Sequence, residues 1–563
     1  MRKIVRIFAV LALCAGGTAV AQPAEETFAE ALRRALEEAA RSGEGCVDGA
    51  CPENRSETVL PNAALGDFLE TLPPDASLAP PAPAAVKVTS VSSDSIYRER
   101  VESSVTSGER GINQPLQDES RVLVMFRPNL TPAEAAQALS DYSLKVVKTL
   151  PLIGAVSVDG SAAIQRFGYA SQTSATTLDK IHKSPVNRLV NRLRRDRRFE
   201  AVTVDAALTP AQIKSVIEPR LRPQGAPGIG AGGSATAATE RKDWGLAAAQ
   251  ITPAMWDLLT IPVTVGVIDD GFAVHEDLPF APGSETGGRD RDHGNHVAGI
   301  MCATHDNGIG IMGVLPNCKV KAAIASIEVA EPELTGSSGD DVEDEIGNLT
   351  TLLAEYVGAV LLFIEANPDA KVINLSLGYN WMPNYGIDPR KRKYKRVRRE
   401  VKNQGVFIRA ILAVAKTRDI VIFSAAGNDS TNLSKPLEAM WASPFNYGSL
   451  EIEKLDGWTN GIIVESYAEN LKRSNFSNVG GHIACPGSDI LSTTALSPRS
   501  IGELSGTSMA SPYCAAAFAG LRSMFGQLTV RQLLACFLNP PKEIGGRVPR
   551  MDLEDAFEKC RNL

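Results

Sequence analysis

Short apolar runs, each bounded by glycine, proline or polar residues, recur through the second half of the chain and alternate with stretches that favour helices. Strands buried on both faces of a parallel sheet have nearly continuous apolar sequences, and helices cover those faces. We therefore expect an α/β domain over residues 243–563, a parallel sheet flanked by helices. The expected strands are VTVGVID (263–269), VKAAIAS (320–326), KVINLSL (371–377), IVIFSAA (420–426), GIIVESY (461–467) and HIACPG (482–487).

A second, shorter pattern occupies residues 119–210. It begins with the apolar run RVLVMF at 121–126, and a Thr-Pro pair then starts a helix. Two further strands, a basic helix at 188–199 and a last strand at 200–208 follow. This β-α-β-β-α-β order predicts a small α+β domain with a ferredoxin-like fold.

The segments on either side of the small domain are weakly patterned. Residues 211–242 include GAPGIGAGGSATAA, a composition typical of a flexible linker with a processing site. Residues 22–118 contain a helical pattern at 25–41 and a Pro/Ala-rich stretch at 72–86 that favours an extended spacer. We interpret 22–118 as poorly ordered, and its helix as a solvated amphipathic segment rather than a partner-binding element.

Residues 1–21 have the features of a secretory signal peptide. Three basic residues precede an apolar stretch at 7–15, and AVA at 19–21 matches an A-x-A cleavage site. The formal net charge of −7 becomes −10 without those three residues, which gives no reason to expect nucleic acid as a partner. No stretch is long enough to span a membrane. We expect an exported protein, periplasmic or extracellular; lipoprotein processing at Cys14 is the disfavoured alternative.

Cysteine usage agrees with export. Removal of the signal peptide takes away Cys14 and leaves eight of the nine cysteines, an even number suited to an oxidising compartment. Eight cysteines allow 105 pairings, and free buried thiols are the alternative. The simplest pairing joins sequence neighbours, namely Cys46–Cys51, Cys302–Cys318, Cys485–Cys514 and Cys536–Cys560.

Four motifs in the α/β region carry groups that peptide-bond hydrolysis by a serine requires. A serine hydroxyl is a poor nucleophile until a base takes its proton, and histidine suits that work near neutral pH. A carboxylate on the other ring nitrogen orients the imidazole, and amide donors stabilise the oxyanion. The motifs are VTVGVIDDG (263–271), DHGNHVAG (292–299), FSAAGN (423–428) and LSGTSMASP (504–512).

These motifs suggest one role for each group. We assign Ser508 as nucleophile, His293 as general base, and Asp269 as the carboxylate that orients it. Asn428 and the Ser508 amide form the expected oxyanion hole. Asp270 is a second candidate for the carboxylate, but strand alternation favours Asp269.

A metal pair made by His293 and His296 is the competing interpretation of HGNHVAG. No acidic or cysteine ligand set accompanies the two histidines at a zinc-like spacing, so we expect no metal there.

The order Asp, His, Ser is that of subtilisin, and all four motifs resemble those of the subtilisin-like serine protease (subtilase) family. The resemblance implies a serine endopeptidase that acts on proteins or peptides through an acyl-enzyme. It also implies a substrate-binding strand at INLSLG, with Ser376, Leu377 and Gly378. No cofactor is required, although many subtilases are stabilised by calcium as a structural ion.

The small domain resembles, in pattern, the inhibitory propeptide that precedes many subtilases. That resemblance implies an autoprocessed precursor whose own propeptide is an intramolecular inhibitor. Two other functions compete: a narrow-specificity processing protease, and a catalytically silent subtilase fold that binds a partner. The acidic insertion at 340–345 and the basic insertion at 390–399 could rim the substrate site, but solvated surface segments are the favoured interpretation.

Overall fold

The computed structural model describes residues 60–72, 117–169, 184–210, 240–288, 290–325, 351–382, 386–431, 433–545 and 547–563. All of them belong to the unit Ser56–Leu563. The expected signal peptide, the helix at 25–41, the Pro/Ala-rich stretch from residue 73 on, most of the linker and the acidic insertion lie outside the described residues.

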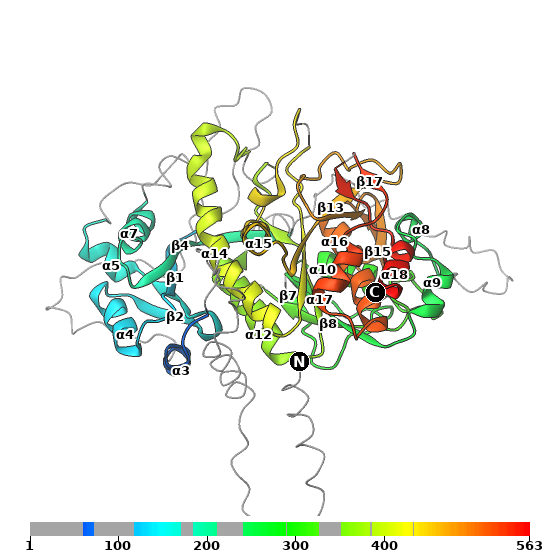
Figure 1. Ribbon diagram of the computed structural model, residues 1–563. Helices are drawn as coiled ribbons and strands as arrows, with labels where there is room; N and C mark the ends of the chain where they lie inside the picture. Colours follow the sequence, from blue (N-terminus) through cyan, green and yellow to red (C-terminus); the bar gives the residue numbers. More distant parts are fainter. Residues whose placement is uncertain are drawn as a thin grey trace, which may run out of the picture. The chain divides into compact units, whose positions relative to one another are not determined.

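A six-stranded parallel sheet forms the centre of the α/β region (Figure 1). All six strands expected from the apolar runs are present, and each pairs in parallel with its neighbours. In sheet order the strands are β14 (Ile483–Pro486), β13 (Gly461–Tyr467), β12 (Val421–Ala425), β10 (Val372–Leu375), β5 (Val263–Asp269) and β8 (Cys318–Ile324).

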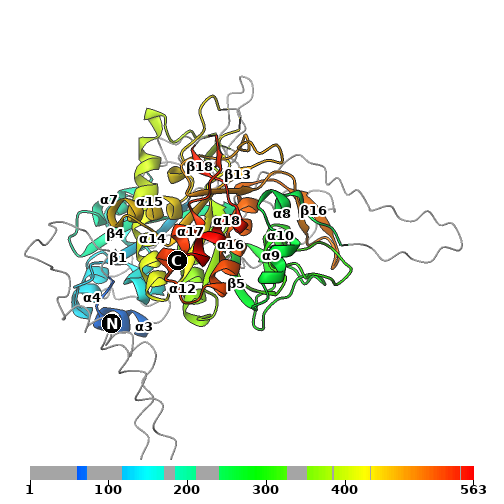
Figure 2. The same cartoon turned by 45° about the vertical axis from the view of Figure 1, so that its right-hand side comes forward.

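Helices cover both faces of this sheet, so successive residues of one strand enter different cores. Phe423 packs with α10 (Arg291–Cys302) and α16 (Thr507–Met524), whereas its neighbour Ile422 packs on the other face. That second face carries α12 (Leu353–Ala366), α14 (Lys395–Thr417) and α15 (Pro444–Asp456). Figures 1 and 2 show the two helical layers on opposite sides of the strands. The prediction of a parallel sheet flanked by helices is confirmed.

Smaller elements complete the α/β region. They are α8 (Trp244–Ala248), α9 (Pro253–Leu258), β6 (Gly271–Phe272), β7 (Gly287–Gly288), β9 (Thr351–Leu352), β11 (Leu377–Gly378), β15 (Ile490–Thr493), β16 (Ile501–Leu504), α17 (Val530–Phe537), β17 (Glu543–Ile544), β18 (Val548–Pro549) and α18 (Leu553–Arg561).

Disulfides join Cys302 to Cys318, Cys485 to Cys514 and Cys536 to Cys560, as the sequence pairing predicted. Cys46 and Cys51 lie outside the described residues. Of the helices described, none has the length and apolarity to cross a membrane.

The small domain is an antiparallel sheet with helices on its outer face. Its strands run in the order β4-β1-β3-β2, with β1 (Gln117–Phe126), β2 (Lys145–Leu150), β3 (Ala155–Asp159) and β4 (Phe199–Pro210). The outer face packs against α4 (Pro132–Asp141), α5 (Ser161–Arg166) and α7 (Pro185–Leu193). Alternate residues of β1, such as Leu123 and Met125, face the α/β region and share its core. The β-α-β-β-α-β order appears as expected, with α5 as an additional helix.

Two helices differ from the sequence expectation. The basic helix starts at Pro185, because Ser184 accepts a hydrogen bond from the Asn187 amide as its N-cap, and it ends at Leu193 rather than 199. Helix α3 (Ala63–Thr71) lies in the segment expected to be poorly ordered. Leu65 and Leu69 are fully buried against the small domain, and Phe68 and Leu72 pack against the same core. The side chain of its N-cap, Asn62, also donates to carbonyl oxygens of the small domain. A few apolar residues in one short helix give too weak a periodic signal to be recognised.

The end of β4 lies between two strands of the α/β region. Ala207 and Leu208 pair with β9, and Thr209 and Pro210 pair with β11, both in antiparallel orientation. Further contacts join the two regions at the same place: Lys148 and Arg194 make ion pairs with Glu355 and Glu400, and Asp205 Oδ1 accepts the Ala354 N–H at the start of α12. β4 is therefore three residues longer than expected, one at its start and two at its end, and its last residues bring β9 and β11 into the sheet of the small domain.

Candidate active site

Asp269 and His293 are brought into contact at the carboxyl edge of the parallel sheet, the edge where such sheets commonly bind ligands. Asp269 is the last residue of β5, and His293 lies in the first turn of α10, whose N-cap is Asp290. Asp269 Oδ1 and His293 Nδ1 are 2.7 Å apart, and neither side chain is exposed. The carboxylate in contact with the ring is thus that of Asp269; Asp270 donates only its backbone N–H to the same oxygen.

The surroundings of His293 make its ring more basic than usual. Burial lowers its pKa, but the charge and hydrogen bond of Asp269, with smaller contributions from Asp290 and Asp270, raise the pKa to about 8. The contact with Asp269 places the Nδ1 proton toward the carboxylate, which leaves the lone pair of the neutral ring on Nε2. Nε2 is buried and has no hydrogen-bond partner among the described residues. It is the ring atom available to accept a proton.

Ser508 is the second residue of α16, and Gly506 is its N-cap. In this structure its Oγ donates to the carbonyl oxygen of Ser376 at 3.4 Å rather than to His293 Nε2. Hydrogen bonds of this kind are often loose before a substrate binds. Pro512 stands four residues later and has no N–H for the Ser508 carbonyl. The Ser376 hydroxyl donates to that carbonyl instead, at 3.2 Å.

Asn428 follows β12 and lies against the start of α16. The N–H and the hydroxyl of Thr507 both donate to Asn428 Oδ1, each at 2.9 Å. With its oxygen held by Thr507, the amide group directs its nitrogen to the opposite side. Gly427 has a φ of +97°, a backbone conformation that favours glycine, and its N–H donates to the Thr507 hydroxyl at 3.0 Å. The Ser508 N–H, in the first turn of α16, is the expected second donor.

A chain of buried hydrogen bonds links β11 to α16. Ser511 Oγ donates to Asn374 Oδ1 at 2.6 Å, and Asn374 Nδ2 donates to Ser376 Oγ at 3.0 Å. Ser376 in turn contacts Ser508, and the next two residues, Leu377 and Gly378, pair with β4. Our sequence analysis missed Asn374 and Ser511. A polar residue inside an apolar strand, as in INLSLG, is the signal that could have identified Asn374.

His296 lies one turn after His293 but has a different environment. Its Nε2 contacts the carbonyl oxygens of Ile490 and Gly502, and burial lowers its pKa to about 3. A ring that donates to main-chain carbonyls is neutral and supports the β15–β16 hairpin. In the described ranges no three His, Cys, Asp or Glu side chains are grouped as a metal centre.

One loop nevertheless gathers oxygen atoms of the kind that calcium prefers. The carboxylate of Asp277 accepts hydrogen bonds from Asn307 Nδ2 and the Ile311 N–H, and Glu240 accepts three N–H groups of residues 306–308. A Cβ on Gly310 would lie 2.0 Å from Asp277 Oδ2, so the loop encloses this carboxylate closely. Two carboxylates and one amide fit a calcium ion by the chemistry of their donors.

Comparison with known proteins places this geometry in a family. The model of the subtilase family matches residues 261–543, half of the chain, and includes all four motifs. The chain belongs to the subtilase family.

Several members align with the same region. Thermitase from Thermoactinomyces vulgaris is 28% identical over 308 residues, which are 52% of this chain and 86% of thermitase. The minor extracellular protease Epr from Bacillus subtilis is 26% identical over 268 residues, 46% of this chain but only 32% of Epr. The chain therefore spans about a third of Epr and most of thermitase.

Two solved structures also resemble the chain. Fervidolysin from Fervidobacterium pennivorans, described as a keratinolytic enzyme related to subtilisin, superposes with a TM-score of 0.48 at 19% identity and covers 78% of this chain and 61% of its own. The epidermin leader peptide processing protease EpiP from Staphylococcus aureus has a TM-score of 0.46 at 18% identity, over 78% of this chain and 98% of its own.

The pKa of His293 predicts how the reactivity of Ser508 depends on pH. A base works only when neutral, and the pKa of about 8 means that the neutral fraction grows through that pH. The rate constant for labelling Ser508 by a fluorophosphonate should therefore rise with pH, with a midpoint about 8. Asp269→Asn should slow labelling by about 10⁴-fold and lower the midpoint. Asp270→Asn is the matched control, and a larger loss there would reverse the assignment of the carboxylate.

Proposed function

We propose that the protein is an exported serine endopeptidase, made as a precursor that its own small domain inhibits. The observation that carries the proposal is the buried contact of Asp269 with His293 Nδ1, at the sheet edge that also holds Ser508 and Asn428. Membership of the subtilase family and the four motifs support it. The three disulfides support an oxidising destination, in agreement with the signal-like sequence at 1–21.

In the proposed reaction, Ser508 Oγ attacks the carbonyl carbon of a peptide bond while His293 Nε2 takes its proton. Asp269 stabilises the imidazolium that forms, and Asn428 with the Ser508 amide binds the oxyanion. Collapse of the adduct breaks the C–N bond, and His293 gives its proton to the leaving amine. Water, deprotonated by His293, then hydrolyses the acyl-enzyme and restores Ser508.

Alanine substitutions test the nucleophile and the oxyanion donor separately. Ser508→Ala should abolish nearly all peptide hydrolysis, on the order of the 10⁶-fold loss known for a removed nucleophile or base. Asn428→Ala should keep fluorophosphonate labelling and lower kcat by about 10²–10³-fold, because only the transition state needs its N–H. The measurement is steady-state hydrolysis of a chromogenic peptide, with the exposed Asn470→Ala as control. Full activity in Asn428→Ala would refute the oxyanion role.

The position of β4 supports autoprocessing. Its last residues pair with β11, and the residue that precedes β11, Ser376, contacts Ser508. Continuing the antiparallel register past Pro210 brings residue 211 opposite Ser376. A chain on this path offers the bond after Ala211 to Ser508 and keeps other substrates away from β11 while it stays there. The proposed processing site therefore falls at the start of the linker, between about 208 and 241.

N-terminal sequencing tests this proposal. Wild-type protein should acquire a new terminus between residues 208 and 241, with Gln212 as the first expected residue, whereas Ser508→Ala should keep its linker intact. Because the linker is tethered beside Ser508, cleavage should proceed at the same rate when the protein is diluted. Equal cleavage of both chains in a protease-free host would exclude self-processing.

We also propose that calcium is a structural ion of this protein, bound by Glu240, Asp277 and the loop that they enclose. At 100 times its dissociation constant a bound ion adds about 2.7 kcal/mol of stability, which should raise the Tm of a protein of this size by roughly 3 °C. Thermal unfolding of Ser508→Ala in calcium, magnesium and a chelator measures the effect. Asp277→Asn should remove the calcium increment. An increment that survives this substitution would place the ion elsewhere.

A further inference from the structure

Ala442 lies between the backbones of Gly378 in β11 and Gly427, the residue before Asn428. We propose that the enzyme selects a small residue, alanine or glycine, immediately before the cleaved bond, and that Ala442 sets this limit. The inference rests on the proposed endopeptidase function and specifies its substrate class.

The register of β4 on β11 indicates how a peptide would lie. Leu377 pairs with Pro210 and Gly378 with Thr209, so the next residue of a peptide on the same path lies opposite Ser376. Ser508 Oγ is 3.4 Å from the Ser376 carbonyl oxygen. The N–H of that residue would face this oxygen, and its carbonyl would face the donors of Asn428 and α16. Its side chain is then directed between the backbone of β11 and that of Gly427.

Ala442 contacts both of these backbones. A Cβ on Gly378 would lie 3.1 Å from the Ala442 carbonyl oxygen, and a Cβ on Gly427 would lie 2.5 Å from the Ala442 methyl group. The same carbonyl accepts the Tyr379 N–H at 2.8 Å, and Ala442 itself is buried. One alanine therefore spans the distance between the two backbones. A substrate side chain directed between these backbones would meet Ala442, and a branched or aromatic one would meet it first.

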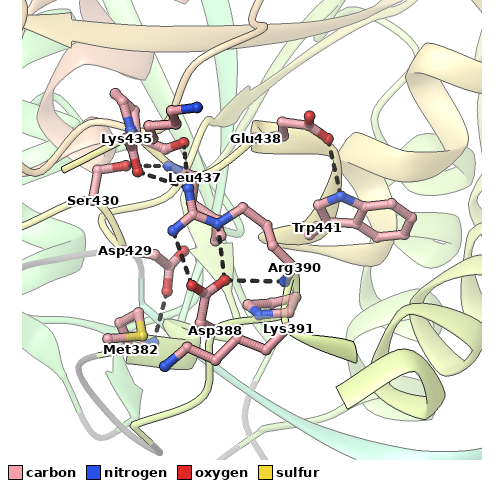
Figure 3. Close-up of polar contacts among 12 residues, drawn as sticks. Met382, Asp388, Arg390, Lys391, Asp429, Ser430, Lys435, Leu437, Glu438 and Trp441 are labelled. Carbon is pink, nitrogen blue, oxygen red and sulfur yellow. Dashed lines mark hydrogen bonds and ion pairs between the residues drawn. The ribbon is translucent and has the colours of Figure 1, made fainter. Parts of the chain in front are cut away.

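Hydrogen bonds between the segments that continue from the two backbones limit their separation. Asp429 Oδ1 accepts the Met382 N–H at 3.0 Å, which ties the segment after β11 to the residue after Asn428 (Figure 3). Trp381 Nε1 donates to the Trp441 carbonyl at 2.6 Å. Widening the space would break these part-buried hydrogen bonds, and each lost bond would cost stability.

A second tie lies further along the same two segments. Arg390 makes a bidentate pair with Asp388 and donates through Nη1 to the carbonyl oxygens of Lys435 and Pro436, at 2.7 and 3.1 Å. Figure 3 shows Arg390 reaching from the Asp388 carboxylate to the Lys435 carbonyl. The segments that continue from β11 and from Asn428 are thus joined at several points, so the limit on size is a rigid one.

The carboxylates of Asp429 and Asp388 do not provide a charge at this position that would select a basic substrate residue. Asp429 is the nearest carboxylate in sequence to Asn428, but it is fully buried, and Asn478 Nδ2 donates to its second oxygen at 2.8 Å. Both oxygens are thus occupied by N–H donors of the protein. Asp388 is already paired with Arg390. Neither acid is available to attract a lysine or arginine of a substrate.

A set of peptides that differ at one position tests the proposal. The series ALTPXQIK copies residues 207–214 of the chain, with X as Gly, Ala, Val, Leu, Phe, Lys or Glu. Wild-type protein should cleave after X with the highest kcat/KM for Ala or Gly, and at least about tenfold lower values for Leu and Phe, since one misfitting methylene already costs that much. Mass spectrometry of the products identifies the bond.

Two variants assign the limit to Ala442. Ala442→Gly should raise kcat/KM for the Val and Leu peptides, relative to Ala, by about tenfold. Ala439→Gly removes a methyl group from the same buried segment and should keep the wild-type profile. Equal cleavage of Phe and Ala peptides by wild-type protein, or an unchanged profile in Ala442→Gly, would overturn the inference alone. Loss of both fluorophosphonate labelling and turnover in wild-type protein would overturn the proposed function, and the inference with it.

Discussion

The burial of α16 against the parallel sheet is the constraint on which the arrangement of the site depends. Every residue from Thr507 to Leu521 is buried, and the helix packs across five of the six strands. Its core-facing residues combine five alanines with the larger Met509, Tyr513, Phe518 and Leu521. Because Ser508 is on this helix, Asp269 ends β5 and Asn428 follows β12, this packing brings the three residues to one place. Directional hydrogen bonds, such as Ser511 to Asn374, then fix their orientation.

Two histidines one turn apart show how environment divides chemical roles. His293 faces a buried carboxylate and its pKa is raised to about 8, whereas His296 faces main-chain carbonyls and burial lowers its pKa to about 3. The helix is the same and both rings are fully buried. The two rings differ in their partners. β5 supplies the carboxylate that contacts His293, and the β15–β16 hairpin supplies the carbonyl oxygens that contact His296. Neither partner lies near the motif in sequence, so only the folded chain distinguishes them.

Much of the fold was predictable from the sequence because its signals are local. Continuous apolar runs mark the six strands, and the order of the motifs places Asp269, His293, Asn428 and Ser508 at one edge of the sheet. Helix α3 was not predictable, since one short helix holds only a few apolar residues and its N-cap Asn62 binds carbonyl groups more than sixty positions away. The junction at β4 was missed because it depends on pairing with residues more than a hundred positions away. The proposed role of Ala442 was not predictable for the same reason, because it follows from the contacts of this alanine in the folded chain and not from its residue type.

The pairing of β4 with β9 and β11 also has a consequence for the physical state of any substrate. The contacts of this strand are made by main-chain amides and carbonyls, which every peptide possesses. Recognition of this type therefore depends first on an extended backbone conformation and only then on the side chains. Under the proposed function, a substrate on the path of β4 would supply about four consecutive residues in extended form, as residues 207–210 do, with their hydrogen-bonding groups unpaired. In helices and in the inner strands of sheets, these backbone groups are already hydrogen-bonded. Compact proteins would therefore resist this enzyme until a segment opens, and their susceptibility would follow the free energy of that local opening.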